Sequence, residues 1–162
     1  YVNGEAQRHI KNQNTDTEII KKLREETGVG VVACKKALLN AQGDLNLAKS
    51  ILEEQGLANA AKKADRETYQ GLVHSYVHSG EKLGSLVTLL CETDFVAKTN
   101  EFKELAHSIA MQSAASKPEA VGELLESEFI KDPSKKISDL IAGAVAKLGV
   151  NIKVREFVVY EI

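Results

Sequence analysis

Residues 71–91 read GLVHSYVHSGEKLGSLVTLLC, and the hydrophobic pattern of this stretch decides the fold class. From Val73 to His78 the small residues Val, Ser and Val alternate with the ring-bearing residues His, Tyr and His, and this period of two predicts a half-buried β-strand. Ser79-Gly80 predicts a turn, and the more apolar stretch from Leu83 to Cys91 predicts a second, more deeply buried strand. Because helical signals come before these strands, the sequence predicts a protein of the α+β class.

The region before residue 71 carries the helical signals. Thr15-x-x-Glu18 is a capping box, and the helix that it begins is expected to end at Gly28. A second helix is expected from Val31 to Ala41, and a third from Asp44, its N-cap, to Gly56. Three short helices joined by tight, glycine-bearing turns predict a compact three-helix bundle.

The region after the two strands adds helices and a third strand. An amphipathic helix is expected over residues 100–113, followed by a weaker helical or loop stretch over residues 118–136. The strongest amphipathic pattern runs from Ile137 to Leu148, where Gly149 is expected to cap the helix. Residues 151–162 are rich in Val, Ile, Phe and Tyr and predict a closing strand. The order ββααβ predicts a three-stranded antiparallel sheet backed by helices.

These patterns predict four segments of the chain. Residues 1–14 are polar and aperiodic and are interpreted as a flexible tail. Residues 15–56 form the predicted three-helix N-terminal domain, and residues 57–70, rich in Ala and Lys at their start, are interpreted as a helical connector. Residues 71–162 form the predicted α+β core domain.

Composition excludes several classes of function. The 21 basic and 23 acidic side chains are interleaved and leave a net charge of −2, so no basic footprint for nucleic acid is expected. No apolar run reaches the roughly 20 residues that a membrane-spanning helix needs. Two cysteines, Cys34 and Cys91, are too few for a disulfide framework and are expected to be buried in a reducing compartment.

Three stretches resemble one known family. They are LREETGVGVVACKKALLNAQGDLNLA at 23–48, CETDFVAKTNEFKELAHSIA at 91–110, and LGVNIKVREFVVYE at 148–161. Together they resemble the elongation factor Ts family, of which the segment from Thr93 to Ala97 is the most distinctive motif. The chain departs from the family pattern at Thr99, which precedes Asn100, and it encodes one core half where long members have two.

The resemblance implies a guanine-nucleotide exchange factor for elongation factor Tu that has no catalytic residue, metal or cofactor of its own. In the family, the Asp-Phe pair of the motif enters the nucleotide-binding domain of elongation factor Tu and disturbs its Mg²⁺ and phosphate site. The residues implied in partner binding are Thr93, Asp94, Phe95, Val96, Arg24, Val31, Val32, Leu148 and Gly149.

Phe95 and the Val31–Val32 pair each admit a second interpretation. An aromatic beside a carboxylate at a bend suits a protein contact, but Phe95 could instead fold back onto Phe102 and Leu105 in the core. Of the two valines, we expect Val31 to face the core of the bundle and Val32 to be exposed. A scattered exposed valine is also common on surfaces that bind nothing.

Two other functions compete with exchange. A small three-helix bundle is also similar to ubiquitin-associated domains, which would make the chain a protein-binding module without exchange activity. An enzyme that uses Cys91 as its nucleophile is the third hypothesis, but an apolar strand beside Glu92 raises the pKa of a thiol. His74 and His78 lie four positions apart on a strand, too far apart to share a metal, so no metal site is expected.

The number of core halves also bears on oligomeric state. Because long members present two halves and this chain has one, we expect a homodimer, with the closing strand at the interface through Ile152, Val154, Val158 and Ile162. The alternative is a monomer in which residues 118–136 cover that surface. The chain does not begin with Met, so we expect either a bacterial cytoplasmic protein or an organellar matrix or stromal protein whose targeting segment was removed.

Overall fold

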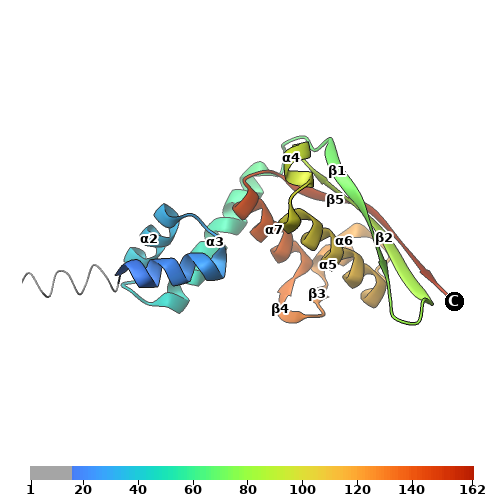
Figure 1. Ribbon diagram of the computed structural model, residues 1–162, viewed down its shortest axis with the longest axis horizontal. Coiled ribbons are helices and arrows are strands. Elements are labelled where there is room, and N and C mark those ends of the chain that lie inside the picture. Colours follow the sequence, from blue (N-terminus) through green and yellow to red (C-terminus); the bar gives the residue numbers. More distant parts are fainter. Residues whose placement is uncertain (1–15) are drawn as a thin grey trace, which may run out of the picture. The chain divides into compact units, whose positions relative to one another are not determined.

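A computed structural model describes residues 16–162, and these residues divide into two compact units with the boundary between Gln55 and Gly56. The expectations for residues 1–14 and for the capping role of Thr15 lie outside the described residues. The model combines helices with a three-stranded antiparallel sheet, so the predicted α+β class is confirmed. Figure 1 shows both kinds of element along the chain.

The first unit is built from short helices around a small apolar core. Residues 16–27 are helical, α2 spans Val31–Asn40, and α3 begins at Leu45. Gly28 follows the first helix with a φ of 69°, and the Asp44 carboxylate accepts the backbone N–H groups of residues 46 and 47, which makes it the predicted N-cap of α3. The core of this unit consists of Leu23, Cys34, Ala37, Leu38, Ala41, Ala48 and Leu52.

The predicted end of the third helix at Gly56 is wrong, because α3 continues to Lys63. A Cβ atom added at Gly56 would lie 3.2 Å from the Cβ of Ala146, which belongs to α7 (Ile137–Leu148). The glycine therefore allows a close approach between α7 and the part of α3 that lies in the second unit, and it does not end α3. Sequence alone does not separate this use of glycine from a helix cap.

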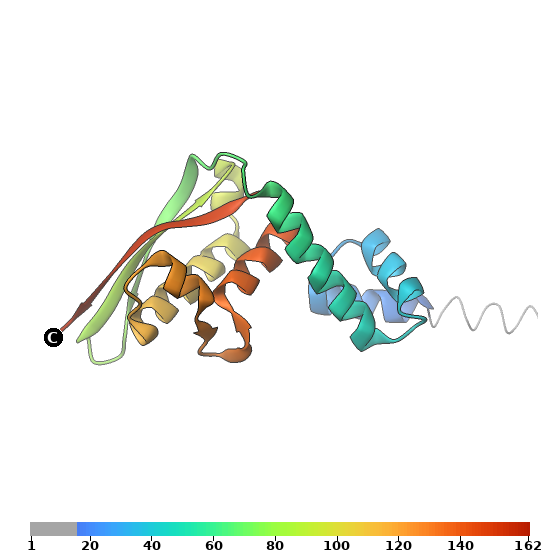
Figure 2. The ribbon, with the colours of Figure 1, turned by 180° about the vertical axis from the view of Figure 1, so that it is seen from behind.

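The second unit contains the sheet and the larger core. The strands β1 (Gln70–Val77), β2 (Leu83–Cys91) and β5 (Ile152–Glu161) are antiparallel in the order β1-β2-β5, so β2 is central. The views in Figures 1 and 2 show the helices of this unit on one side of the twisted sheet. The buried core joins β2 to the helices and includes Val87, Leu89, Phe102, Ile109, Ile137 and Val145.

The region between β2 and β5 holds more elements than predicted. After α4 (Asp94–Ala97) and α5 (Asn100–Ser116) come α6 (Val121–Glu126) and a small hairpin, β3 (Glu128–Phe129) with β4 (Asp132–Lys136). The expectation of a weaker helical or loop stretch over residues 118–136 holds for α6 but misses the β3–β4 hairpin.

A buried side chain explains the hairpin. Gln112 of α5 donates to the carbonyl oxygen of Glu128 at 2.9 Å and accepts the N–H of Ile130 at 2.9 Å. The DPSKK stretch of β4 carries no strand pattern of its own, and the amide that bonds the hairpin comes from a distant helix, so local sequence does not predict it.

A register shift changes which side chains of β5 face the helices. Leu89 pairs with Val154 but Thr88 pairs with Glu156, so Arg155 is an extra residue in β5. One extra residue reverses the alternation of faces along the strand. Ile152 is consequently buried in the core, whereas Val158 is exposed on the uncovered face of the sheet.

Because of this register shift, the dimer interface expected on the closing strand needs correcting. Its four apolar residues do not share one face, because Ile152 and Val154 pack on the core side whereas Val158 and Ile162 are exposed. The uncovered face instead carries exposed apolar residues from three strands and the chain end, namely Val73, Val77, Leu86, Val158, Tyr160 and Ile162.

The contact at Gly56 yields a test of α3. Gly56→Leu is expected to lower the free energy of unfolding by about 1–3 kcal/mol, because the new side chain meets Ala146. Gly143→Ala, in α7, meets no atom within 4 Å and is expected to raise the free energy of unfolding by about 0.5–1 kcal/mol. Denaturant titrations measure both, and an unaffected Gly56→Leu variant would contradict the close approach.

Candidate protein-binding site

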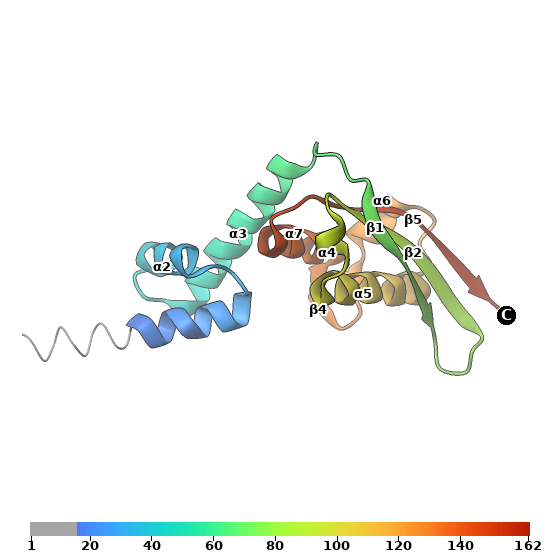
Figure 3. The same cartoon turned by 45° about the horizontal axis from the view of Figure 1, so that its top comes forward.

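The Thr93–Ala97 motif forms a capped single turn of helix directly after the central strand. The Thr93 hydroxyl accepts the N–H of Val96 at 3.3 Å and so caps α4, and the Cys91 thiol donates to the Thr93 carbonyl oxygen at 3.1 Å. Thr99, the departure from the family pattern, is the N-cap of α5 and accepts the N–H of Phe102. Figure 3 shows α4, in yellow-green, at the end of the sheet where β1 begins.

Phe95 points into solvent from this turn. Its side chain is 88% exposed, whereas Ala97 is buried and Val96 packs against the core. Phe102 and Leu105 are themselves buried without it, so the alternative in which Phe95 folds back onto them is wrong. Thr93 caps the start of the turn, the Thr99 hydroxyl donates to the Val96 carbonyl oxygen at its end, and its other side is packed, so the exposed ring sits on a fixed backbone.

Asp94 is held by a neighbouring cation. Lys98 Nζ lies 2.5 Å from Asp94 Oδ2, in an i,i+4 pair on the surface. Such exposed pairs contribute little to stability. The contact therefore orients the carboxylate beside Phe95 without burying it, and both groups stay accessible to another molecule.

A second predicted segment lies at the same end of the sheet. Leu148 ends α7 and packs partly against the core, and Gly149 follows with a φ of 76°, a backbone conformation that favours glycine. The register pairs Cys91 with Ile152, so the end of β2 and the start of β5 are neighbours. The structure thus brings the segments 93–96 and 148–149 to one end of the second unit.

The remaining predicted residues belong to the first unit. Arg24 is exposed, and Val32 at the start of α2 is 83% exposed. The expectation that Val31 faces the core is wrong, since it is 48% exposed. The first turn of α2 extends beyond the packed part of the bundle, whose core on this helix begins at Cys34.

The titratable groups near the sheet do not form a nucleophile and base pair. Burial raises the pKa of the Cys91 thiol, as expected for an apolar strand, and its sulfur is occupied by the Thr93 carbonyl. His74 Nε2 lies 3.1 Å from His107 Nδ1, and the pKa of His74 is lowered by burial and by that neighbour. His78 pairs with the Tyr76 hydroxyl at 2.9 Å.

Other kinds of site are absent from the part of the chain that the structure describes. Over residues 16–162, no three side chains of His, Cys, Asp or Glu are arranged to hold a metal ion. Within the same range, no helix combines the length and the apolar character that crossing a membrane requires.

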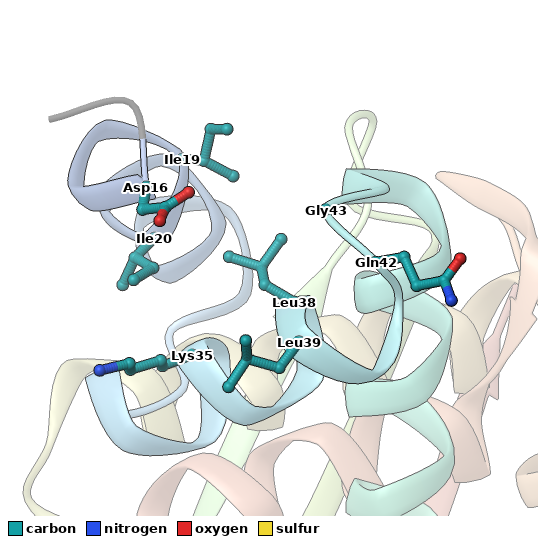
Figure 4. A pocket seen from close by; sticks show the side chains of 8 residues that line it. All are labelled: Asp16, Ile19, Ile20, Lys35, Leu38, Leu39, Gln42 and Gly43. Atoms are coloured by element: carbon teal, nitrogen blue, oxygen red, sulfur yellow. The ribbon is translucent and has the colours of Figure 1, made fainter. Parts of the chain in front are cut away.

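A groove of about 290 Å³ lies in the first unit (Figure 4), between the first helix and α2. Apolar side chains such as Leu38 and Leu39 line most of it, and its only charged side chains are Asp16 and Lys35. It offers no constellation for catalysis.

Sequence reasoning missed two residues beside the site. Glu92 accepts the backbone N–H of Asn151 at 2.6 Å, and Asn151 is only 3% exposed. No local pattern marks them: Asn151 precedes a strand that also carries Lys153, Arg155 and Glu156, and its burial depends on the hydrogen bonds that it makes.

Comparison with known proteins places these features in a family. The family model described as "Elongation factor TS" matches residues 92–162. Elongation factor Ts of Moorella thermoacetica is 40% identical over 88% of this chain and 93% of its own length. The proteins of the same name from Thermoanaerobacter sp. and Herpetosiphon aurantiacus are 40% and 41% identical, over 89% and 88% of this chain.

Fold and site together define an α+β protein that presents a rigid, exposed aromatic, a group that commonly anchors contacts between proteins. With relatives of this identity over nearly their whole length, the chain belongs to the elongation factor Ts family. Its role is in the elongation stage of protein biosynthesis. The family model matches residues 92–162 of the second unit, a region that the ubiquitin-associated interpretation leaves unexplained.

The contrast between two phenylalanines tests the exposure of the site. Phe102→Ala is expected to lower the free energy of unfolding by about 3–5 kcal/mol, because Phe102 is fully buried. Phe95→Ala is expected to change it by less than about 0.5 kcal/mol, as for other surface positions. Chemical denaturation of both variants measures this, and a strongly destabilised Phe95→Ala variant would mean that Phe95 is a core residue.

Proposed function

We propose that the protein binds elongation factor Tu in its GDP form and promotes the release of GDP, so that GTP can be loaded. The observation that carries this proposal is Phe95, an exposed aromatic on a capped turn within the stretch that matches the family. A large aromatic held in solvent on a fixed backbone is the kind of side chain that anchors protein interfaces, so its position favours a binding role.

The mechanism is a coupling between two binding events. Phe95 and Asp94 enter the nucleotide-binding domain of elongation factor Tu, with Thr93 and Val96 holding the turn that carries them. A factor that binds the nucleotide-free form more tightly must weaken GDP binding by the same ratio. The protein then leaves unchanged, and no group of this chain needs to move a proton or bond to a phosphate.

Further contacts widen the proposed interface. Arg24, Val31 and Val32 are all exposed on the first unit, and two exposed valines side by side at a helix start form a small apolar patch. Leu148 and Gly149 lie at the same end of the second unit as α4. We propose that both sets touch elongation factor Tu and that its nucleotide-binding domain is the partner surface.

The location of the protein follows from this partner. We propose that it works in the cytoplasm of a bacterial cell, where elongation factor Tu serves translation. The named relatives come from bacteria, which supports this compartment over an organelle.

We also propose a homodimer through the uncovered face of the sheet. Leu86 of the central strand lies between Ser75 and the exposed Val158, and Tyr160 and Val77 extend the apolar surface along the sheet. Residues 118–136 do not cover this face, because its apolar side chains are exposed. A second copy placed there would bury the surface and supply a second core half.

Release of fluorescent GDP from elongation factor Tu tests the exchange function. Catalytic amounts of the protein are expected to accelerate release by orders of magnitude. Phe95→Ala is expected to lose about 2–4 kcal/mol of binding, as for a central aromatic anchor. Ile130→Ala, which also truncates an exposed apolar side chain but in the turn between β3 and β4, serves as the control outside the proposed interface. An unchanged release rate with folded protein and a matched partner would refute the proposal.

Light scattering tests the dimer. A mass near twice 17.6 kDa is expected at micromolar concentration, and Leu86→Lys is expected to return it to 17.6 kDa because a charge then lies in the apolar interface. Lys103→Glu, on the exposed side of α5, is the control for a change of charge. A wild-type mass of 17.6 kDa would exclude the dimer.

A further inference from the structure

Asn151 ties three segments of the second unit together. Its backbone N–H donates to Glu92 Oε1 at 2.6 Å, and its side-chain Nδ2 donates to the carbonyl oxygens of Arg66 at 2.7 Å and Ala64 at 3.3 Å. The residue is almost fully buried. A buried polar group of this kind is stable only with its hydrogen bonds made, so its position is strictly determined.

Glu92 is the charged member of this group. Its carboxylate accepts a short, charge-assisted hydrogen bond from the Asn151 amide, and Arg66 Nη1 lies 3.5 Å from the same oxygen. The Glu92 side chain is 21% exposed and the Arg66 side chain 52% exposed. The stronger restraint is therefore the bond to the buried amide, not the partly solvated ion pair.

The position of this bond in the chain gives it a second consequence. Glu92 directly precedes Thr93, the N-cap of α4, and Asn151 follows Gly149 by two residues. The Glu92–Asn151 bond thus links the base of the segment that carries Phe95 to the turn that carries Gly149. Packing of Val96 and Ala97 fixes the inner side of α4, and the Glu92–Asn151 bond adds a side-chain link from its base to the α7–β5 turn, next to the strand pairing of Cys91 with Ile152.

We propose that Glu92 is a positioning residue for nucleotide release, which acts by holding the Phe95 turn and the Gly149 turn in one fixed geometry. This inference rests on the proposed exchange function. Glu92 acts through Phe95 and need not touch the partner. Removing the Glu92 carboxylate is expected mainly to slow GDP release within the bound complex. A slightly displaced Phe95 still binds the partner but disturbs its nucleotide site less effectively.

Hydrogen exchange in the free protein tests, without the partner, whether the Glu92–Asn151 bond orders α4. The N–H groups of Val96 and Ala97 bond to Thr93, so hydrogen exchange at these two amides reports the order of α4. Glu92→Ala is expected to accelerate their exchange at least tenfold, and Glu92→Gln to restore protection, since its amide oxygen can still accept the Asn151 N–H. Unchanged protection in Glu92→Ala would overturn the inference.

A kinetic readout tests the consequence for release. The rate of GDP release is measured against the concentration of the factor, which separates the maximal rate from the half-saturating concentration. Glu92→Ala is expected to lower the maximal rate roughly tenfold or more with a smaller change in half-saturation, and Glu92→Gln to recover most of it. Glu101→Ala is the control, because this exposed carboxylate makes only a 3.8 Å surface contact with Lys147.

A double variant separates positioning from general destabilisation. If Glu92 acts through Phe95, adding Glu92→Ala to Phe95→Ala causes little further loss of the maximal rate. A full additional loss in the double variant, or a loss that follows the unfolded fraction alone, would overturn the inference. If the wild-type protein does not accelerate GDP release from elongation factor Tu, the proposed nucleotide-exchange function is wrong. The amide hydrogen-exchange result still decides whether Glu92 orders α4.

Discussion

The central strand β2 is the constraint on which the rest of the second unit depends. It pairs along its length with both β1 and β5, so its end at Cys91 determines where the chain leaves the sheet. The next residues make the Thr93–Ala97 turn, and the start of β5 at Ile152 lies beside the same end. A shift in the pairing register of β2 would therefore displace both segments that we propose for partner binding.

Phe95 shows how a fold can keep an apolar anchor in water. The turn that carries it is too short to be stable alone, because one helical turn pays most of the cost of nucleation for few hydrogen bonds. The Thr93 cap, the bond from the Thr99 hydroxyl to the Val96 carbonyl oxygen, and the packing of Val96 and Ala97 supply the missing stability. The ring is thus positioned before any partner arrives, which lowers the entropy cost of binding.

Much of the fold could be predicted from local patterns, and the errors share one cause. The helix over residues 137–148 and its glycine cap were predicted correctly, since periodicity and capping are local signals. Gly56, by contrast, serves a contact with Ala146, and the β3–β4 hairpin depends on Gln112. Neither signal can be read locally, because the partner atoms come from distant parts of the chain.

The sequence by itself determined the α+β class, the order of the main helices and strands, and the motif that carries the resemblance, because each is written in neighbouring residues. Only the tertiary structure decided which side chains are exposed. The extra residue Arg155 reverses the faces of β5, and the exposure of Phe95 depends on what else fills the core. The bond from Glu92 to Asn151 likewise joins residues that meet only when β2 and β5 pair, so no local pattern encodes it.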